Sequence, residues 1–361
     1  MNVVLAGGGT AGHVEPALSL ADALRAHDAA ITVTALGTER GLEMRLVPAR
    51  GYQLDLIPAV PLPRKVSADM FRVPVRLLSA VRETSEHLRN RRADVVVGFG
   101  GYVALPAYLA ARRRRIPIVV HEANAKPGLA NRVGARFAAK VAVTYDAGSL
   151  PHAVVTGLPI RRVIADLDRA AGRAAARSEF GLDPDRPTLL VFGGSQGAQR
   201  INAAITGAAQ ALAAAGAQVL HSTGAANIEA VRADVANVPN YVAVPYLDRM
   251  DLAYAAADVA LCRAGATTCA EMNAVGLPAV FVPFAAGNGE QRLNAAPAVA
   301  AGGALMVLDA DLDARWVEAT VVPLLVDRPR LAAMSQAAKN LGRPNADAAL
   351  MALVLDVAGV P

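Results

Sequence analysis

Short apolar runs rich in β-branched residues alternate with helix-compatible stretches along the first part of the chain. Residues 2–6 lead into glycines at 7–9, residues 94–97 lead into a second glycine cluster, and residues 16–26 have a helical pattern. This alternation is typical of a parallel sheet whose strands are joined by helices. Further strands are predicted at residues 31–36, 116–120, 141–144 and 153–156.

The same pattern starts again after a variable stretch, rich in alanine and arginine, that ends at Pro187. Residues 188–192 lead into a third glycine cluster at 193–197, and an alanine-rich helix follows to about residue 215. This repetition predicts a second sheet of the same kind. Its other strands are expected at residues 218–222, 241–244, 259–262 and 279–282.

We therefore expect an α/β protein with two Rossmann-like, doubly wound parallel-sheet domains. The first would span residues 1–157 and the second residues 158–340, while residues 341–361 would form a helical segment that could pack on either domain. In open α/β sheets, ligands bind beyond the carboxyl ends of the strands. The glycine loops should accordingly face a cleft between the two domains.

Composition narrows the class of protein. Of the 361 residues, 54% are hydrophobic and 19% are charged, which excludes a disordered chain. The apolar stretch 295–308 is interrupted by Pro297, Gly302 and Gly303, and it is shorter than the roughly 18 to 20 residues that span a bilayer. The N-terminus has no basic region before its first strand, so we predict no signal peptide and a cytoplasmic location.

Charge is distributed unevenly between the two halves of the chain. Residues 1–157 carry 20 Lys and Arg against 12 Asp and Glu, whereas the remainder carries 16 against 19. Residues 60–92 hold 8 basic and 3 acidic residues among apolar ones such as Met70 and Phe71, and four arginines follow at 112–115. An amphipathic helix with a solvated basic face would look similar, but the pattern favours peripheral contact with anionic lipid. Aromatic residues make up only 4%, so nucleic acid is a poor alternative.

The first glycine loop formally matches a dinucleotide-binding motif. Gly7, Gly9 and Gly12 satisfy G-x-G-x-x-G, but the acidic residue expected about 20 positions later is absent from residues 31–36, and Glu39 comes late in a loop. Any one such loop could simply turn a tight corner. Backbone N–H groups at a helix N-terminus also bind phosphate, and the presence of three such loops favours two anionic ligands, one per domain.

His13 lies where the first glycine loop becomes a helix. A helix N-terminus disfavours the imidazolium form, so His13 is expected to be neutral near pH 7 and able to accept a proton. A capping or packing role is the alternative. Glu15 and Asp146 are weaker candidates for the same catalytic base.

Residues 262–271 follow a strand and open a helix in the second half. Thr268-x-x-Glu271 matches a capping box, which would make Glu271 structural, but a carboxylate there also suits a ribose diol. The polar loop 284–291 suits sugar hydroxyls, although an ordinary surface loop has the same composition. Asp309-x-Asp311 imitates a metal-binding motif, but its distance from the other motifs favours a solvated loop without a metal.

Six motifs occur in the order typical of one family: GGTAGHV at residues 8–14, GGYV at 100–103, HEAN at 121–124, GGSQGA at 193–198, CRAGA at 262–266 and GLPA at 276–279. With these motifs the chain resembles the MurG glycosyltransferases. The resemblance implies a GT-B fold and transfer of N-acetylglucosamine (GlcNAc) from UDP-GlcNAc to the C4 hydroxyl of N-acetylmuramic acid (MurNAc) in undecaprenyl-pyrophosphoryl-MurNAc-pentapeptide. It also implies a role in peptidoglycan synthesis, inversion at the anomeric carbon without a metal or other cofactor, and a position at the inner face of the membrane.

The resemblance further implies roles for individual residues. Glu271 would bind the ribose, the backbone near Leu247 would read the uracil, and His13 would face the acceptor and the transferred sugar, either as the base or as a ligand of the acceptor phosphate. Leu158 and Ala123 depart from the usual pattern, as does Glu290 where a glutamine is common. The implied donor-binding residues are Asn124, Arg161, Ser195, Gln196, Leu247, Arg263, Ala266, Thr267, Thr268, Glu271 and Gln291, and the implied acceptor-binding residues are Thr10, Ala11, Gly12, His13, Gly100, Gly101 and Tyr102.

Two other functions fit the same sequence. A UDP-GlcNAc 2-epimerase on the same scaffold would need only the nucleotide sugar, and a non-catalytic binder would use His13 only as a cap. A nicotinamide dehydrogenase is the least favoured alternative because it lacks the acidic ribose ligand.

Overall fold

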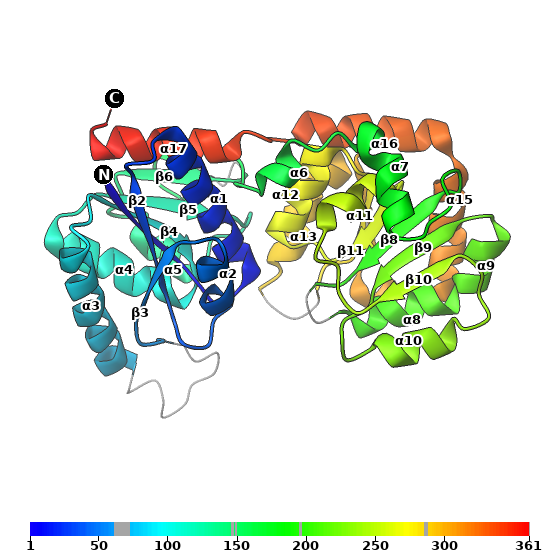
Figure 1. Cartoon of the computed structure of the whole chain (residues 1–361), viewed down its shortest axis with the longest axis horizontal. Helices are drawn as coiled ribbons and strands as arrows, with labels where there is room; N and C mark the ends of the chain where they lie inside the picture. The colour runs from blue at the N-terminus through cyan, green and yellow to red at the C-terminus, as the bar shows by residue number, and fades with distance from the viewer. Residues whose placement is uncertain (61–72, 146–147, 149, 195–196, 285–287, 361) are drawn as a thin grey trace. The chain divides into compact units, whose positions relative to one another are not determined.

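The computed structural model describes residues 1–60, 73–145, 148, 150–194, 197–284 and 288–360. The chain forms two compact units: unit 1 comprises Met1–Arg161 with Pro344–Pro361, and unit 2 comprises Arg162–Arg343. The C-terminal helix α17 (Ala346–Ala358) packs on α1 (Ala11–His27) and adds Leu350 and Val354 to the core of unit 1 (Figure 1). The structure thus assigns this helix, which the sequence could not place, to the first unit.

Unit 1 is built on a seven-stranded parallel sheet with the order β3-β2-β1-β4-β5-β6-β7. Its helices cover the sheet, and the strands are largely buried, which explains the continuous apolar runs in the sequence. The strands are β1 (Asn2–Gly7), β2 (Thr32–Gly37), β3 (Gln53–Leu56), β4 (Val95–Gly100), β5 (Ile118–Glu122), β6 (Lys140–Val143) and β7 (Ala153–Val155). The remaining helices are α2 (Glu43–Ala49), α3 (Val73–Asn90), α4 (Gly101–Arg114) and α5 (Leu129–Gly134).

Unit 2 repeats this design with six parallel strands in the order β10-β9-β8-β11-β12-β13. The single alanine-rich helix expected here is two helices in the structure, because the helix is interrupted at Ala208. The strands are β8 (Thr188–Phe192), β9 (Gln218–Ser222), β10 (Tyr241–Val244), β11 (Val259–Cys262), β12 (Ala279–Phe281) and β13 (Ala304–Met306). The helices are α6 (Arg162–Ala165), α7 (Arg169–Glu179), α8 (Gln199–Gly207), α9 (Ala209–Ala214), α10 (Ile228–Asp234), α11 (Met250–Ala256), α12 (Ala266–Val275), α13 (Glu290–Ala300), α14 (Ala314–Trp316), α15 (Val322–Val326) and α16 (Arg328–Leu341), with a 3-10 turn at Asp309–Asp311 and a π-helical turn at Val317–Val321.

Each sheet reverses its strand order at one point. β1 lies between β2 and β4 in unit 1, and β8 lies between β9 and β11 in unit 2. Ligands of doubly wound sheets bind beyond the carboxyl ends of the strands at such switch points. The glycine loops after β1, β4 and β8 and the start of α12 after β11 all follow these strands, so the fold class predicted from the sequence is confirmed and each unit has one expected binding edge.

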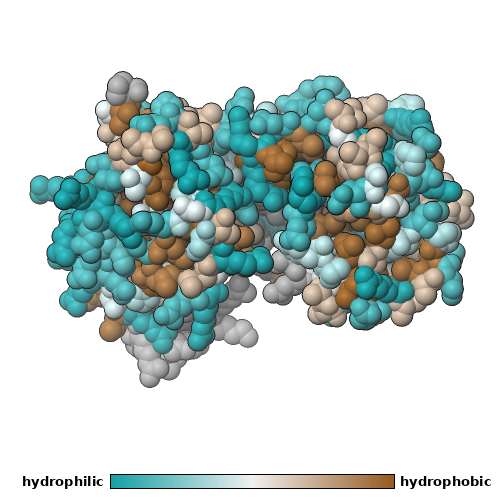
Figure 2. All heavy atoms as spheres, viewed as in Figure 1, coloured by the Kyte–Doolittle hydropathy of each residue, from teal (hydrophilic) through white to brown (hydrophobic). Residues whose placement is uncertain are grey.

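The surface is mixed in character. On the face seen in Figure 2, hydrophilic side chains predominate and apolar ones gather in separate patches. Among the residues that the structure describes, no helix combines the length and the apolar character needed to cross a bilayer.

Two buried histidines make stability depend on pH. Burial lowers the pKa of His121 to about 4 and that of His221 to about 3, against 6.5 for an exposed histidine. Below pH 6.5 the unfolded chain therefore binds more protons than the folded chain. The free energy of unfolding accordingly decreases as the pH is lowered from 6.5 toward the pKa values of the folded state. Between pH 7 and pH 5 each histidine is expected to reduce the free energy of unfolding by about 2 kcal/mol, measured by urea denaturation.

A pair of variants isolates this effect. His221→Gln should weaken the pH dependence, whereas the exposed His27→Gln should retain it in full. Equal slopes in these two variants would contradict the assignment.

Candidate active site

The loops after β1 and β4 meet at His13. Its Nδ1 lies 3.2 Å from the Gly8 carbonyl oxygen and 3.2 Å from the Thr10 hydroxyl, and Thr10 is the N-cap of α1. Gly101 has φ of +78°, and a Cβ there would lie 3.1 Å from His13 Nδ1 and against the Gly8 carbonyl. Only glycine permits this approach. The structure thus brings together Thr10, His13, Gly100 and Gly101, which the sequence had placed in one acceptor-binding set.

His13 is suited to act as a proton acceptor. Burial lowers its pKa, while the bond to the Gly8 carbonyl and the charges of Glu122 and Glu43 oppose this. The direction is the expected one, but the main cause is burial and not the helix terminus. Because a carbonyl oxygen only accepts hydrogen bonds, we assign the proton to Nδ1, which leaves the Nε2 lone pair to take a proton.

The structure supports neither Glu15 nor Asp146, the other two candidates, as the base. Glu15 forms an ion pair with Arg50, whose Nη2 lies 2.7 Å from Glu15 Oε2, so Glu15 is held away from a catalytic role. Asp146 lies outside the described residues. His13 therefore stays the best candidate for the base.

Glu43 supports the first glycine loop and was missed in the sequence. Its Oε2 accepts the Gly9 N–H at 2.9 Å and its Oε1 accepts the Thr38 N–H at 2.9 Å. The carboxylate is fully buried, and a Cβ at Gly8 would lie 2.7 Å from it. Gly9 thus donates its N–H to a side chain of the protein, so this N–H is not available to phosphate. Glu43 lies four positions after Glu39, the acidic residue considered from the sequence. It belongs to the short helix α2 and to no recognised motif, so no local pattern pointed to it.

A buried carboxylate also fixes the loop that carries Asn124. Glu122 Oε1 accepts the Asn124 N–H at 2.9 Å, and Oε2 accepts the Gly128 N–H at 3.0 Å and the Asn131 amide at 2.9 Å. Tyr108 donates to Asn131 at 2.7 Å from the core behind. Asn124 is therefore held at the carboxyl end of β5. Tyr102 is half exposed, and its ring borders Gly9.

In unit 2 the loop after β8 is tightly turned. Gly194 and Gly197 have φ of +105° and +74°, and the Gly197 N–H donates to the Gly194 carbonyl at 3.0 Å. Gly197 packs directly on the Thr223 carbonyl, which also accepts the amide of Asn202 at 3.0 Å. Ser195 and Gln196, the predicted pyrophosphate ligands, lie outside the described residues.

Glu271 is buried within α12, with 6% of its surface exposed, and its Oε2 accepts the Tyr254 hydroxyl at 2.6 Å. The capping-box interpretation is wrong, because α12 begins at Ala266 with Gly265 as its N-cap and without a side-chain cap. Thr268 already lies inside the first turn. Thr267 Oγ1 in the same turn is buried without a hydrogen-bond partner among the residues described.

Arg263 and Asp309 form an ion pair that the sequence did not predict. Arg263 Nη1 donates to an oxygen of Asp309 and, at 3.2 Å, to the Val282 carbonyl. Its guanidinium also lies 5.4 Å from the centre of the Phe284 ring, and Asp309 reaches Arg200 at 3.5 Å. The expectation of a solvated loop at Asp309 is therefore wrong. In the described part of the chain, no three His, Cys, Asp or Glu side chains are grouped as metal ligands.

Three further residues of the predicted donor site are Gln291, Leu247 and Arg161. Gln291 Oε1 accepts the Phe284 N–H at 2.9 Å, so this amide shapes the loop before α13. Leu247 is buried in the segment between β10 and α11, and the half-buried Arg161 ends the first part of unit 1.

Comparison with known proteins shows the family to which the chain belongs. The model of the glycosyltransferase family 28 N-terminal domain matches residues 3–143, and that of the C-terminal domain matches residues 188–350. The chain belongs to the MurG branch of glycosyltransferase family 28. It is similar to the "UDP-N-acetylglucosamine--N-acetylmuramyl-(pentapeptide) pyrophosphoryl-undecaprenol N-acetylglucosamine transferase" of Streptomyces coelicolor, with 58% identity over 99% of this chain and 98% of the relative. The protein of that name from Mycolicibacterium smegmatis is 59% identical over 99% of this chain and 94% of its own length.

Solved structures show the same fold. MurG of Acinetobacter baumannii superposes with a TM-score of 0.77 at 30% identity, covering 98% of this chain and 99% of that one. The calicheamicin glycosyltransferase CalG4 gives 0.69 at 18% identity, covering 98% of each chain. UDP-GlcNAc 2-epimerase from Neisseria meningitidis gives 0.70 at 13% identity, covering 99% of this chain and 100% of that one, a likeness that concerns the GT-B fold alone.

Proposed function

We propose that this enzyme transfers GlcNAc from UDP-GlcNAc to the C4 hydroxyl of MurNAc in undecaprenyl-pyrophosphoryl-MurNAc-pentapeptide, a step of peptidoglycan precursor synthesis. The observation that carries this proposal is identity of 57% to 60% with transferases of that name over nearly the whole chain. The arrangement around His13 and the buried Glu271 supports it independently.

The proposed reaction is one displacement at the anomeric carbon. The C4 oxygen of the acceptor forms a bond to this carbon, the bond to the phosphate oxygen of UDP breaks, and His13 Nε2 takes the C4 hydroxyl proton. UDP leaves with the bonding electrons. Negative charge grows on its pyrophosphate, so N–H donors of the loop after β8 and the guanidinium of Arg161 would stabilise the transition state more than the ground state.

Unit 2 would bind the donor in this reaction. Glu271 is the expected ribose ligand, and the Tyr254 hydroxyl fixes the orientation of its carboxylate. Arg263, anchored by Asp309, is expected at the donor end of the site. Unit 1, which carries the excess of positive charge, would bind the lipid pyrophosphate of the acceptor.

An assay with labelled UDP-GlcNAc tests the proposal. With a MurNAc-pyrophosphoryl-lipid acceptor, label should move into the lipid, and without acceptor the donor should remain unchanged. Conversion of the donor to an epimer without acceptor would favour the isomerase that the shared fold allows. Binding of UDP-GlcNAc without any product would indicate a non-catalytic binder.

Asp309→Asn tests the anchoring of Arg263. The change removes one partner of an ion pair in which the Arg263 side chain is only 13% exposed, so Arg263 should lose its fixed orientation. We expect KM for UDP-GlcNAc to rise about 5- to 20-fold with a smaller change in kcat. Asp311→Asn, an exposed neighbour in the same turn, is the matched control and should leave KM unchanged. Equal behaviour of the two variants would contradict the anchoring role.

The proposal also includes peripheral binding to the cytoplasmic membrane surface. On α3, Val75 and Leu78 are 72% and 48% exposed, beside the exposed Arg76 and Arg82. The basic end of α4 lies against α3, because Arg114 at this end donates a hydrogen bond to the Ser85 carbonyl of α3 at 2.7 Å. Exposed apolar side chains among basic ones suit an anionic lipid surface. Met70 and Phe71, which the sequence placed in the same patch, lie outside the described residues.

Vesicle sedimentation tests this surface. The enzyme should bind vesicles with anionic lipid at low salt, and the double change Val75→Ser with Leu78→Ser should reduce binding several-fold. Val163→Ser, an exposed valine of unit 2, is the control. Failure of the unaltered enzyme to bind anionic vesicles would refute the membrane role.

A further inference from the structure

A network of buried hydrogen bonds lies behind the glycine loop after β8 in unit 2. It begins at Tyr241 on the edge strand β10, passes through His221 on β9 and Asn202 near the start of α8, and ends at the Thr223 carbonyl. The side chains of His221 and Thr223 are fully buried, and Asn202 is 5% exposed. Polar groups buried in this way need complete hydrogen bonding, because each unmade bond costs free energy. We call these four residues the His221 network.

The donors of the His221 network all point in one direction. Asn202 Nδ2 donates to the Thr223 carbonyl at 3.0 Å, which turns Asn202 Oδ1 toward His221 Nε2 at 3.1 Å. Because this amide oxygen only accepts, we assign the imidazole proton to Nε2. His221 Nδ1 then accepts the Tyr241 hydroxyl at 2.6 Å. Burial lowers the pKa of His221 to about 3, so the imidazole is neutral at pH 7 and each of its nitrogens has the partner it needs.

The Thr223 carbonyl is the group against which the glycine loop closes. Gly197 packs directly on this oxygen, has φ of +74° and has no room for a Cβ. The Asn227 amide also donates to the carbonyl, at 3.1 Å, so the oxygen is held from two sides. Gly197 is followed by Ala198, the N-cap of α8, and the first N–H groups of a helix have no intrahelical acceptor. Because Asn202 belongs to α8 itself, its two hydrogen bonds fix the start of this helix relative to β9.

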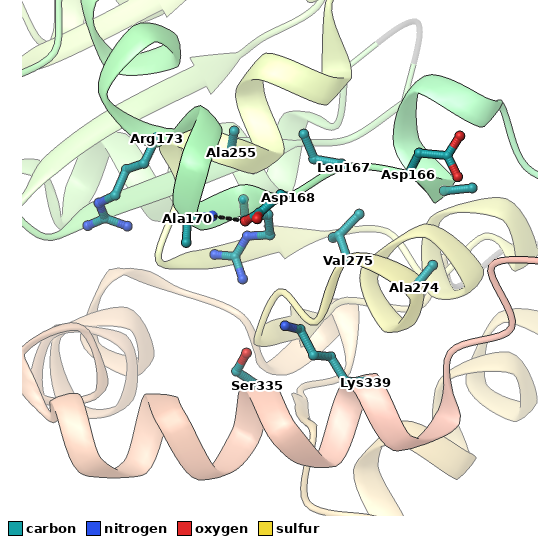
Figure 3. A pocket seen from close by; sticks show the side chains of 12 residues that line it. Asp166, Leu167, Asp168, Ala170, Arg173, Ala255, Ala274, Val275, Ser335 and Lys339 are labelled. Carbon is teal, nitrogen blue, oxygen red and sulfur yellow. Dashed lines mark hydrogen bonds between the residues drawn. The ribbon is translucent and has the colours of Figure 1, made fainter.

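The opposite edge of the sheet does not share this network. The pocket shown in Figure 3 includes Ala255 and Val275, which precede strands β11 and β12, so it lies at the amino ends of the strands. No residue of the His221 network lines this pocket. His221 instead pairs with Val191, one residue before the carboxyl end of β8. The network therefore acts at the carboxyl edge, to which the proposed donor site belongs.

We propose that His221 is a positioning residue for the binding of the donor pyrophosphate. Through Asn202 it fixes the Thr223 carbonyl and the start of α8, so the N–H groups of this loop are oriented before the donor binds. Donors that are already oriented bind more tightly, because less order has to be gained on binding. His221 itself is buried and contacts no substrate. The proposal rests on the proposed function, which places the pyrophosphate at this loop.

Calorimetric titration of the full-length enzyme with UDP, and with uridine, which lacks the pyrophosphate, tests this role. His221→Leu removes both hydrogen bonds of the imidazole, so UDP should bind about tenfold more weakly while the affinity for uridine stays within about twofold. His221→Gln offers an N–H donor close to the place of Nε2 and should restore UDP binding to within about threefold. Tyr241→Phe, the milder change, leaves His221 Nδ1 without its donor and should weaken UDP binding about threefold, again without an effect on uridine.

Gln218→Leu is the matched control. Gln218 lies on the same strand and is 1% exposed, and its amide donates to Thr188 Oγ1 at 2.9 Å and to the Asp183 carbonyl at 2.8 Å, but at the amino end of β9. Loss of these bonds should lower the thermal unfolding temperature, as His221→Leu does, and leave the binding of UDP and uridine unchanged.

The proposal is overturned if His221→Leu and Gln218→Leu lose UDP affinity alike, or if the affinities for UDP and uridine fall together in His221→Leu and Tyr241→Phe. UDP binding is measured without acceptor, so a failure of GlcNAc transfer would count against the proposed function alone.

Discussion

His13→Ala is expected to lower kcat for GlcNAc transfer by about 10²- to 10⁴-fold, the range for loss of a general base. The change removes the Nε2 lone pair that takes the C4 hydroxyl proton and leaves unit 2 intact. Affinity for UDP-GlcNAc, measured by calorimetry, should therefore stay within about twofold. The pH profile adds a second test: because burial lowers the pKa of His13, the acid limb of kcat should lie below pH 6.5 and vanish in the variant.

Glu15→Gln is the control for this experiment. Glu15 lies on the same helix, but its carboxylate pairs with Arg50, so its loss should affect stability more than turnover. Unchanged turnover in a folded His13→Ala enzyme would remove His13 from the mechanism.

Glu271→Ala is expected to weaken UDP binding about 10²-fold. The change deletes an acceptor that would bind the ribose diol, and it leaves the buried Tyr254 hydroxyl without the partner at 2.6 Å. Loss of hydrogen bonds to a charged carboxylate, from the ribose on one side and from Tyr254 on the other, accounts for this size. UDP calorimetry measures the effect, and Glu271→Gln, which keeps one acceptor oxygen, should lose only about tenfold.

Tyr254→Phe distinguishes the direct contact of Glu271 with the ribose from the orientation of the Glu271 carboxylate by Tyr254. It keeps the Glu271 carboxylate and removes only the hydroxyl that fixes it, so UDP affinity should fall by no more than about fivefold. Thermal unfolding of each variant shows whether the protein remains folded. If Glu271→Ala is folded and binds UDP as tightly as the unaltered enzyme, the ribose role is wrong.

Much of the fold could be predicted because the central strands are buried on both faces. Such strands need continuous apolar residues, and β1, β4, β8 and β11 have them. Strand β3 was missed because Gln53 and Asp55 make this edge strand alternate in polarity. Strand β13 has only three residues, and its apolar run continues into its surroundings. The packing of α17 on unit 1 depends on surface complementarity, which leaves no local signal.

In the candidate site, too, the motifs could be found from the sequence, whereas the contacts between distant residues could not. The meeting of His13 with Gly100 and Gly101 requires β1 and β4 to be neighbours, which the motifs suggested but did not fix. The hydrogen bond from the Gly9 N–H to Glu43 and the pairing of Asp309 with Arg263 join residues 34 and 46 positions apart. Neither spacing belongs to a motif, so only the folded chain reveals them.

The configuration of the new glycosidic bond tests the central claim most directly. UDP-GlcNAc has the α configuration, and one displacement with His13 as the base inverts it. Proton NMR of the isolated lipid-linked product should therefore show a β-linked GlcNAc on C4 of MurNAc, with the large coupling of a diaxial anomeric proton. An α linkage, or label found only in a free or epimerised sugar, would contradict the account.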